Sequence, residues 1–184
     1  PMSRGLGDVY KRQVMGHVKD ITNLNSLTKW VQDQFDTRLN WDDVKRIKDW
    51  WGGKLIIKGI MDPDDAKMAQ KCGADALVVS NHGGRQLDGV NSSISTLPEI
   101  KKAVSNMEVL MDGGISSGQD ILKAIAMGAE GVMIGRSFVY GLSAGGKEGV
   151  TKSLEILNKE LDMTMALCGR RDIKDVGRDI IKDC

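Results

Sequence analysis

Apolar residues along the chain fall into two kinds of segment, short continuous runs and longer stretches with helical spacing. Continuous runs rich in Val, Ile and Leu, several of them ending in glycine, are typical of buried parallel strands. They predict strands over residues 54–59, 76–80, 109–111 and 131–134. Helical spacing and end signals predict helices over residues 25–38, 41–51, 62–72, 96–105, 117–127 and 147–167.

Several helix starts carry recognisable capping residues. Proline is favoured in the first helical turn, and Pro63 occupies that position in helix 62–72. In helix 41–51 we expect Val44 and Ile47 to face inward, because they lie near one side of the helix. Asn40 and Ser117 are expected to cap the helices that they open or precede, because their side chains can accept a hydrogen bond from the first turn.

Two segments of the chain are alike, which suggests a repeated βα unit. Residues 73–80 and 128–135 each run from a helix end through a Gly-Ala turn into an apolar strand. Short turns before each strand and polar loops after it predict an α/β fold, a partial TIM (β/α)8 barrel. An open doubly wound sheet is the alternative, but no Gly-x-Gly-x-x-Gly follows the first strand. Since a complete barrel has eight strands in about 250 residues, four βα units indicate a half barrel.

The composition is that of an ordinary folded domain. The 184 residues are 41% hydrophobic and 28% charged, and a formal net charge of +1 gives no electrostatic reason to expect a nucleic-acid partner. No apolar run approaches the roughly 20 residues of a membrane span, and the first residues lack the apolar centre of a signal peptide. The three cysteines are widely spaced, which favours reduced thiols and a cytoplasmic location.

Polar groups follow the predicted strands, at the edge where barrels carry their chemistry. Lys58 stands at the end of an apolar strand. Three roles are open for it: a Schiff-base nucleophile, a fixed cation that faces an anionic cofactor, or a surface lysine. His82 and Arg85 lie in a glycine-containing loop after the second strand. Imidazole suits proton abstraction near neutral pH, and a guanidinium holds a carboxylate at two points. The pair points to an anionic substrate that loses a proton or hydride, with an Arg85–Asp88 ion pair as the structural alternative.

Glycine-containing ends of the third and fourth strands point to phosphate binding. Asp112, Gly113 and Gly114 follow the third strand, and Gly135 and Arg136 follow the fourth. Backbone N–H groups of such loops bind phosphate in many barrels, where an arginine adds a charge-assisted contact. The alternative is that these glycines only permit tight turns.

Four segments resemble, in order and spacing, the FMN-dependent α-hydroxy acid oxidases and dehydrogenases, a family that includes glycolate oxidase, mandelate dehydrogenase and L-lactate dehydrogenase. They are Ile57–Gly59, Ser80–Asp88, Asp112–Gly114 and Ile134–Arg136, and the string SNHGGRQLD of the second is the most specific. The resemblance covers residues 25–184 and implies the C-terminal half of the family's barrel. Residues 1–24 lie outside it and are predicted to be an irregular tail, for which a non-native origin is one hypothesis.

The resemblance implies a role for each residue at the strand ends. His82 matches the active-site base and Arg85 the arginine that binds the substrate carboxylate, while Lys58 matches the lysine beside flavin N1 and O2. Ser116 lies where the family has an arginine, so a weaker grip on the cofactor is expected, by about 1–3 kcal/mol. Further FMN contacts are implied for Ser80, Asp112, Gly113, Gly114, Gly135 and Arg136.

The implied reaction is FMN-dependent oxidation of an L-2-hydroxy acid, such as lactate, to a 2-oxo acid, with oxygen, a quinone or a cytochrome as electron acceptor. The family's first four strands supply further contacts that this sequence does not match, so turnover by this chain alone is an open question. Exposed strand edges of a half barrel favour a homo-oligomer. Some relatives attach to the inner face of a membrane through the segment before Asn40, which leaves peripheral membrane contact open.

Two other functions are open at this point. One is a different phosphate-binding barrel enzyme, in which Lys58 forms a Schiff base with a carbonyl substrate. The other is a non-catalytic, self-associating half barrel that keeps a residual phosphate or FMN site.

Overall fold

A computed structural model describes residues 29–30, 33 and 36–182. The chain divides into two compact units, residues 1–40 and 41–184. In the first unit Lys29, Trp30 and Asp33 are helical, in agreement with the predicted helix 25–38, but residues 36–38 are not helical, so the predicted end of that helix is wrong. Its residues 25–28, 31–32 and 34–35, and the tail predicted over residues 1–24, lie outside the described residues.

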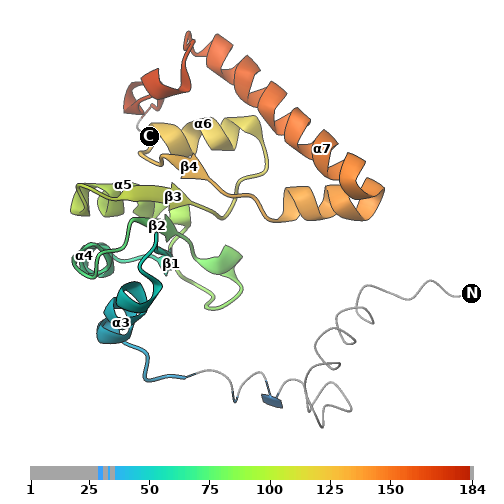
Figure 1. The fold of residues 1–184 in the computed structure, drawn as a ribbon. Coiled ribbons are helices and arrows are strands. Elements are labelled where there is room, and N and C mark those ends of the chain that lie inside the picture. The colour runs from blue at the N-terminus through green and yellow to red at the C-terminus, as the bar shows by residue number, and fades with distance from the viewer. Residues whose placement is uncertain (1–28, 31–32, 34–35, 183–184) are drawn as a thin grey trace, which may run out of the picture. The chain divides into compact units, whose positions relative to one another are not determined.

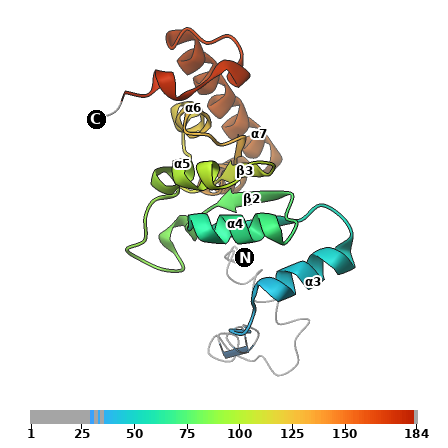
Figure 2. The ribbon, with the colours of Figure 1, turned by 90° about the vertical axis from the view of Figure 1, so that its left-hand side faces the viewer.

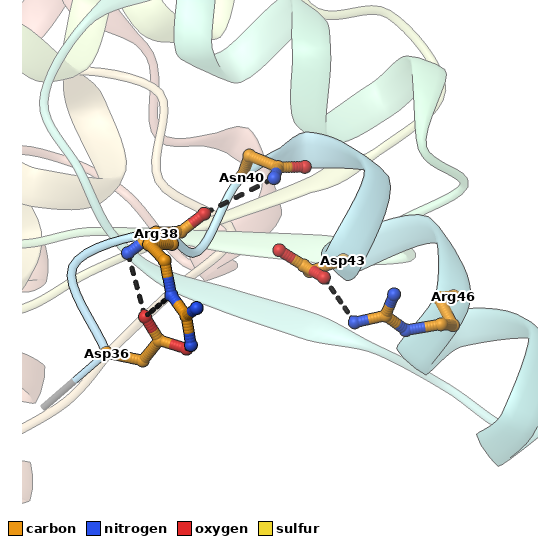
Figure 3. Close-up of polar contacts among 5 residues, drawn as sticks. All are labelled: Asp36, Arg38, Asn40, Asp43 and Arg46. Carbon is orange, nitrogen blue, oxygen red and sulfur yellow. Dashed lines mark hydrogen bonds and ion pairs between the residues drawn. The ribbon is translucent and has the colours of Figure 1, made fainter. Parts of the chain in front are cut away.

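Local polar contacts order the end of the first unit (Figure 3). Asp36 accepts hydrogen bonds from the Arg38 guanidinium at 2.9 Å and from the Arg38 backbone N–H at 3.0 Å, which lower the pKa of this carboxyl. Asn40 Nδ2 donates to the Arg38 carbonyl at 3.3 Å. The capping role expected of Asn40 stays a prediction. The other pair in Figure 3, Asp43 and Arg46, lies in the second unit.

The second unit contains a parallel sheet of four strands (Figure 1). The spatial order of the strands follows the chain, β1-β2-β3-β4, and each neighbouring pair is parallel. Sequential parallel strands joined by helices are the arrangement of successive βα units in a barrel, so the predicted fold class is confirmed. The strands are β1 (Ile56–Ile60), β2 (Ala76–Val79), β3 (Glu108–Met111) and β4 (Gly131–Val132).

Helices alternate with these strands, and three of them lie along one face of the sheet (Figures 1 and 2). These three are α4 (Pro63–Lys71), α5 (Ser93–Ala103) and α6 (Gly118–Ala126). Helix α3 (Trp41–Trp51) precedes β1, and α7 (Arg136–Leu167) follows β4 and contacts α6. Short helical turns complete the unit: η1 (His82–Gly84), η2 (Ile173–Asp175) and η3 (Arg178–Ile180).

Capping side chains determine where α4 and α6 begin. Asp62 Oδ1 accepts hydrogen bonds from the N–H groups of Asp64 and Asp65, at 2.7 and 3.4 Å. Ser117 and Asp120 form a capping box, in which Ser117 Oγ accepts from the Asp120 N–H and the Asp120 carboxylate accepts from the Ser117 N–H. Such a cap stabilises a helix by about 1 kcal/mol. The predicted cap at Ser117 is confirmed, and the cap at Asp62 is a further finding of the structure.

The core lies between the sheet and the helices on its covered face. Leu77 and Val79 of β2, Val109 of β3, and Leu97 and Ile100 of α5 are fully buried. Burial of each such side chain contributes about 1.5–3 kcal/mol. Because β2 and β3 are packed this tightly, the residues that follow them stand on rigid supports.

Two burial expectations are wrong. β1 was expected to be buried, but Ile56 is 54% exposed, because among the described residues β1 is an edge strand with a partner on one side only. In α3 Ile47 is 46% exposed rather than inward-facing, and this helix has no buried residue.

Several predicted boundaries also differ from those observed. Helix α5 begins at Ser93 rather than at residue 96, since Ser92 Oγ caps it by accepting the N–H of Ser95. The helix predicted over 147–167 continues a helical segment that begins at Arg136, with non-helical backbone at Gly145 and Gly146. β4 spans two residues rather than four. None of the helices in the described part of the chain is long and apolar enough to cross a lipid bilayer.

Candidate functional site

The carboxyl ends of β1, β2 and β3 bring together a lysine, a serine and an aspartate. Lys58 Nζ donates to Ser80 Oγ at 2.8 Å and lies 2.8 Å from Asp112 Oδ2. Neighbouring parallel strands end at one edge of the sheet, which is why residues 58, 80 and 112 meet although they are far apart in sequence. Ser80 is buried, so it links the lysine to the rigid centre of the sheet.

One oxygen of this cluster has no partner. Asp112 Oδ1 is buried and accepts no hydrogen bond from any described residue, while Oδ2 pairs with Lys58. A buried carboxylate oxygen without a donor is unfavourable by about 1–3 kcal/mol or more. Such an orphan acceptor suits a ligand that brings a hydroxyl or N–H group, and the ribityl chain of FMN is a hydroxyl donor of this kind. The residues present therefore fit that cofactor.

His82 stands beside this cluster in an unusual backbone conformation. Its N–H donates to Ser80 Oγ at 3.2 Å, and a Cβ built on Gly59 would lie 2.9 Å from His82 Nε2, so the imidazole packs against the backbone of β1. Among the described residues His82 is the only non-glycine with positive φ, at 55°. This conformation is unfavourable by roughly 1–3 kcal/mol and is typical of functional sites. The absence of a side chain at Gly59 makes room for the ring.

Arg85 is exposed three residues after His82. No described residue forms an ion pair with its guanidinium, and Asp88 instead accepts from the N–H of Gly89 at 2.9 Å. The Arg85–Asp88 pair considered from the sequence is therefore not formed. A cation in this position is free to bind an anion from solution.

The glycines after β3 leave space along their backbone. Gly113 and Gly114 have φ values of 90° and 78°, and a Cβ on Gly114 would meet no atom within 4 Å. A side chain on Gly113 would instead approach Ser93 Oγ to 3.1 Å. Glycine at both positions permits the left-handed turn and keeps the strand end accessible.

Ser116 is engaged by a neighbour. Its N–H and its hydroxyl both donate to Asp120 Oδ2 at 3.1 Å, and the two donors of Ser117 reach the same oxygen at 2.9 Å. Burial opposes ionisation of Asp120, but these hydrogen bonds outweigh it and lower the pKa of the carboxyl. The Asp120 carboxylate thus lies at the N-terminus of α6. The cofactor contact expected of Ser116 stays a prediction.

Gly135 and Arg136 form the start of α7. Gly135 is the N-cap without a capping side chain, and a Cβ there would meet no atom within 4 Å. Arg136 is exposed and pairs with no acidic group in the described part of the chain. An uncapped helix start next to an arginine suits an anionic group such as phosphate.

Sequence reasoning missed two residues that hold this site, Asn81 and Ser93. The Asn81 backbone N–H donates to Ser93 Oγ at 3.3 Å, and the Asn81 side chain accepts from the N–H of Gly83 at 3.0 Å. An asparagine two residues before a glycine is a known signal for a turn closed by the side chain. No comparable signal exists for Ser93, because its contact depends on how α5 packs.

Sequential parallel strands with helices on one face and polar groups at the carboxyl ends are the arrangement of part of a β/α barrel. A family model described as FMN-dependent dehydrogenase matches residues 5–183, and the chain belongs to this family. The match includes most of the segment predicted as a tail. The boundary predicted between residues 24 and 25 stays a prediction.

Individual relatives agree with the family assignment. The chain is 45% identical over 181 residues to an L-lactate dehydrogenase of Caulobacter vibrioides, covering 92% of this chain and 47% of that one. It is 49% identical over 159 residues to an L-lactate dehydrogenase of Allorhizobium ampelinum, covering 86% and 42%. A crystal structure of mandelate oxidase with (S)-2-phenylpropionate matches with a TM-score of 0.73 and 42% identity, covering 75% and 42%. The chain therefore spans about half the length of the curated relatives it matches.

Proposed function

We propose that this chain carries the substrate-binding and cofactor-binding residues for FMN-dependent oxidation of an L-2-hydroxy acid, such as lactate, to the 2-oxo acid. The observation that carries the proposal is the cluster of Lys58, Ser80 and Asp112, with the His82 imidazole beside it. The family relationship supports the reaction class. As the chain covers about half of its relatives, turnover by this chain alone is part of what the experiment below tests.

Arg85 and His82 are the residues proposed to act on the substrate. The unpaired guanidinium of Arg85 binds the substrate carboxylate, and a two-point contact fixes the orientation of the adjacent carbon. The His82 imidazole accepts one proton from the substrate. Loss of two electrons and two protons in total converts the hydroxyl carbon to a carbonyl carbon, so atoms and charges balance.

The remaining strand-end residues are proposed to hold FMN, which supplies the two-electron acceptor when bound. Asp112 Oδ1 would accept a hydrogen bond from a cofactor hydroxyl, and the Lys58 ammonium would stabilise negative charge on the cofactor. Ser80, Gly113 and Gly114 line the same edge. Gly135 and Arg136 bind the phosphate, and Ser116 contributes the least because both its donors reach Asp120.

Oxygen, a quinone or a cytochrome is the proposed final electron acceptor. The expected homo-oligomer and a peripheral membrane contact belong to the proposal in the same way. A cytoplasmic location is proposed with them.

The ion pair of Lys58 bears on the Schiff-base alternative. An ammonium group that pairs with Asp112 and donates to Ser80 carries no lone pair for attack on a carbonyl. Borohydride trapping of a carbonyl substrate on Lys58 would have to succeed for that function to be adopted.

A second candidate is a non-catalytic, self-associating unit, and the exposed apolar residues favour it. Trp50 is 76% exposed and Ile56, on the edge strand β1, is 54% exposed. Unpaired strand edges and exposed apolar side chains promote association of copies.

The test is anaerobic flavin spectroscopy of the purified chain supplemented with FMN. We expect the visible absorbance of FMN to shift on binding and to bleach when L-lactate is added, with D-lactate as the control that leaves the band unchanged. Binding without bleaching would favour the non-catalytic unit. Absence of binding would contradict a cofactor function for this chain.

A further inference from the structure

Asn81 anchors both ends of the loop that carries His82 and Arg85. Its Oδ1 accepts a hydrogen bond from the Gly83 N–H at 3.0 Å, at the start of the loop. Its Nδ2 donates to the carbonyl of Asn91, ten residues along the chain, at 3.3 Å. One side chain therefore closes the loop on itself.

The backbone of Asn81 is fixed to the elements around it. Its N–H donates to Oγ of Ser93, which is the first residue of α5 and is 2% exposed. A Cβ built on Gly113 would lie 3.3 Å from Asn81 Oδ1, so the amide also packs closely against the backbone after β3. Asn81 thus connects the loop to α5 and to the backbone that follows β3.

The loop needs such support because the backbone conformation of His82 is unfavourable. His82, Gly83 and Gly84 have φ values of 55°, 68° and 71°, all in the left-handed region. A residue with a Cβ rarely adopts this region unless neighbouring contacts hold it there. The side chain of Asn81 and its carbonyl provide these contacts, through the N–H groups of Gly83 and Gly84, the latter at 3.0 Å.

We infer that Asn81 is a positioning residue, which holds the loop so that the His82 imidazole lies against Gly59 and Arg85 follows it in a fixed backbone turn. Asn81 acts through these two residues and touches no substrate. The inference rests on the proposed function for the meaning of this placement, but the placement itself is measurable in the chain without FMN.

Three variants separate the contacts of Asn81. Asn81→Ala removes both side-chain hydrogen bonds. Asn81→Ser keeps a hydroxyl that can accept from the Gly83 N–H but cannot reach Asn91. Asn91→Ala is the matched control, because Asn91 contributes only its backbone carbonyl.

Nuclear magnetic resonance of the full chain reads the placement directly. The sequence has two histidines, so a His17→Gln background leaves the ring signals of His82 alone. In the parent chain we expect a nuclear Overhauser effect between the His82 ring and the Gly59 Hα protons. In Asn81→Ala we expect this effect to disappear and the Gly83 amide to exchange roughly five- to tenfold faster, the loss of about one hydrogen bond. Asn91→Ala should retain both properties.

Titration with L-lactate, followed by the His82 ring signals, tests the consequence for binding. We expect the lactate affinity to fall in Asn81→Ala, to fall less in Asn81→Ser, and to stay unchanged in Asn91→Ala. An unchanged ring contact and unchanged Gly83 exchange in Asn81→Ala would overturn the inference, as would equal losses in the control.

If Asn81→Ala does not fold, Asn81→Ser decides the question in the same way, by its lactate affinity relative to Asn91→Ala. If the parent chain binds no lactate, the proposed substrate roles of His82 and Arg85 fail. The ring contact and the amide exchange then still decide whether Asn81 positions the loop.

Discussion

The two ends of the parallel sheet differ in how far their charged groups have partners within the protein. At the amino ends, the Asp75 carboxylate accepts from Lys48 at 2.6 Å, from Lys54 at 2.7 Å and from the N–H of Leu55 at 2.9 Å. These contacts, the lysine hydrogen bonds first, hold the pKa of Asp75 well below its usual range. The carboxylate is thus fully occupied by the protein.

Glu130 repeats this arrangement at the amino ends of β3 and β4. It occupies the same place as Asp75 in the repeated Gly-Ala turn, pairs with Lys101, and accepts from the N–H of Val109 at 2.6 Å. Each carboxylate therefore ties the turn before one strand to an earlier strand of the sheet. This end of the sheet is built for stability.

The carboxyl ends leave comparable groups unsatisfied. Asp112 has one buried oxygen without a partner, and Arg85 and Arg136 pair with no acidic group among the described residues. His82 is held in a strained conformation. Apart from the Lys58–Asp112 ion pair, the carboxyl ends thus carry charged groups without partners among the described residues, and this contrast supports the proposed ligand site there.

The largest effect is expected at the carboxyl ends of the strands, for His82→Gln. Removal of a general base lowers turnover by roughly 10²–10⁴-fold, so lactate-dependent bleaching of bound flavin should slow by this factor. FMN affinity, measured by quenching of flavin fluorescence, should be unchanged, because His82 is proposed to act on the substrate. Loss of FMN binding together with bleaching would show that His82 holds the site rather than acting as a base.

At the amino ends of the strands, Asp75→Asn should lower the urea midpoint of unfolding at neutral pH without changing FMN affinity. The pKa of Asp75 is lower in the folded chain than its ordinary value of about 3.9, so its contacts stabilise the fold above that pH. This stabilisation is lost as the pH falls through the folded-state pKa. The difference between parent and variant should therefore shrink as the pH is lowered from about 4.

The control for this pH experiment is Asp49→Asn on α3, since Asp49 forms no ion pair among the described residues. It should show no such pH-dependent difference. An Asp75→Asn chain with the parent's midpoint at every pH would contradict a stabilising role for the amino ends.

A smaller effect is expected for Ser117→Ala, which removes half of the capping box of α6. Loss of such a cap lowers the free energy of unfolding by about 1 kcal/mol. Ser105→Ala is the matched control, as only the backbone N–H of Ser105 is used, in a bond to Gln70. Equal midpoints for the two variants in urea unfolding would argue against the cap.

The smallest effect is expected for Ser116→Ala. Because its hydroxyl already donates to Asp120, its removal should change FMN affinity by roughly two- to threefold at most. Fluorescence titration with FMN measures this directly. A loss of tenfold or more would mean that the hydroxyl leaves Asp120 and contacts the cofactor.

The sequence was most informative where chemistry and local structure coincide. The cap at Ser117 and the apolar run of β2 follow from short-range signals, and the parallel sheet follows from the order of the predicted strands. The family resemblance rested on the same short segments.

Features that depend on tertiary packing could not be predicted from the sequence. Ile56 reads like any buried strand residue, and only the position of β1 at the sheet edge exposes it. The hydroxyl of Ser116 reads as an available ligand until Asp120 is seen to accept it. Asn81 holds its loop through Asn91 and Ser93, contacts that depend on where α5 begins.

FMN titration of two lysine variants tests the contrast between the two ends of the sheet most directly. Lys58→Met and Lys54→Met each remove a lysine that pairs with an aspartate, at the carboxyl end and the amino end respectively. We predict that Lys58→Met weakens FMN affinity by at least about tenfold, the loss of a charged contact, while Lys54→Met leaves it unchanged. Equal FMN affinities for the two variants would contradict a ligand site at the carboxyl ends.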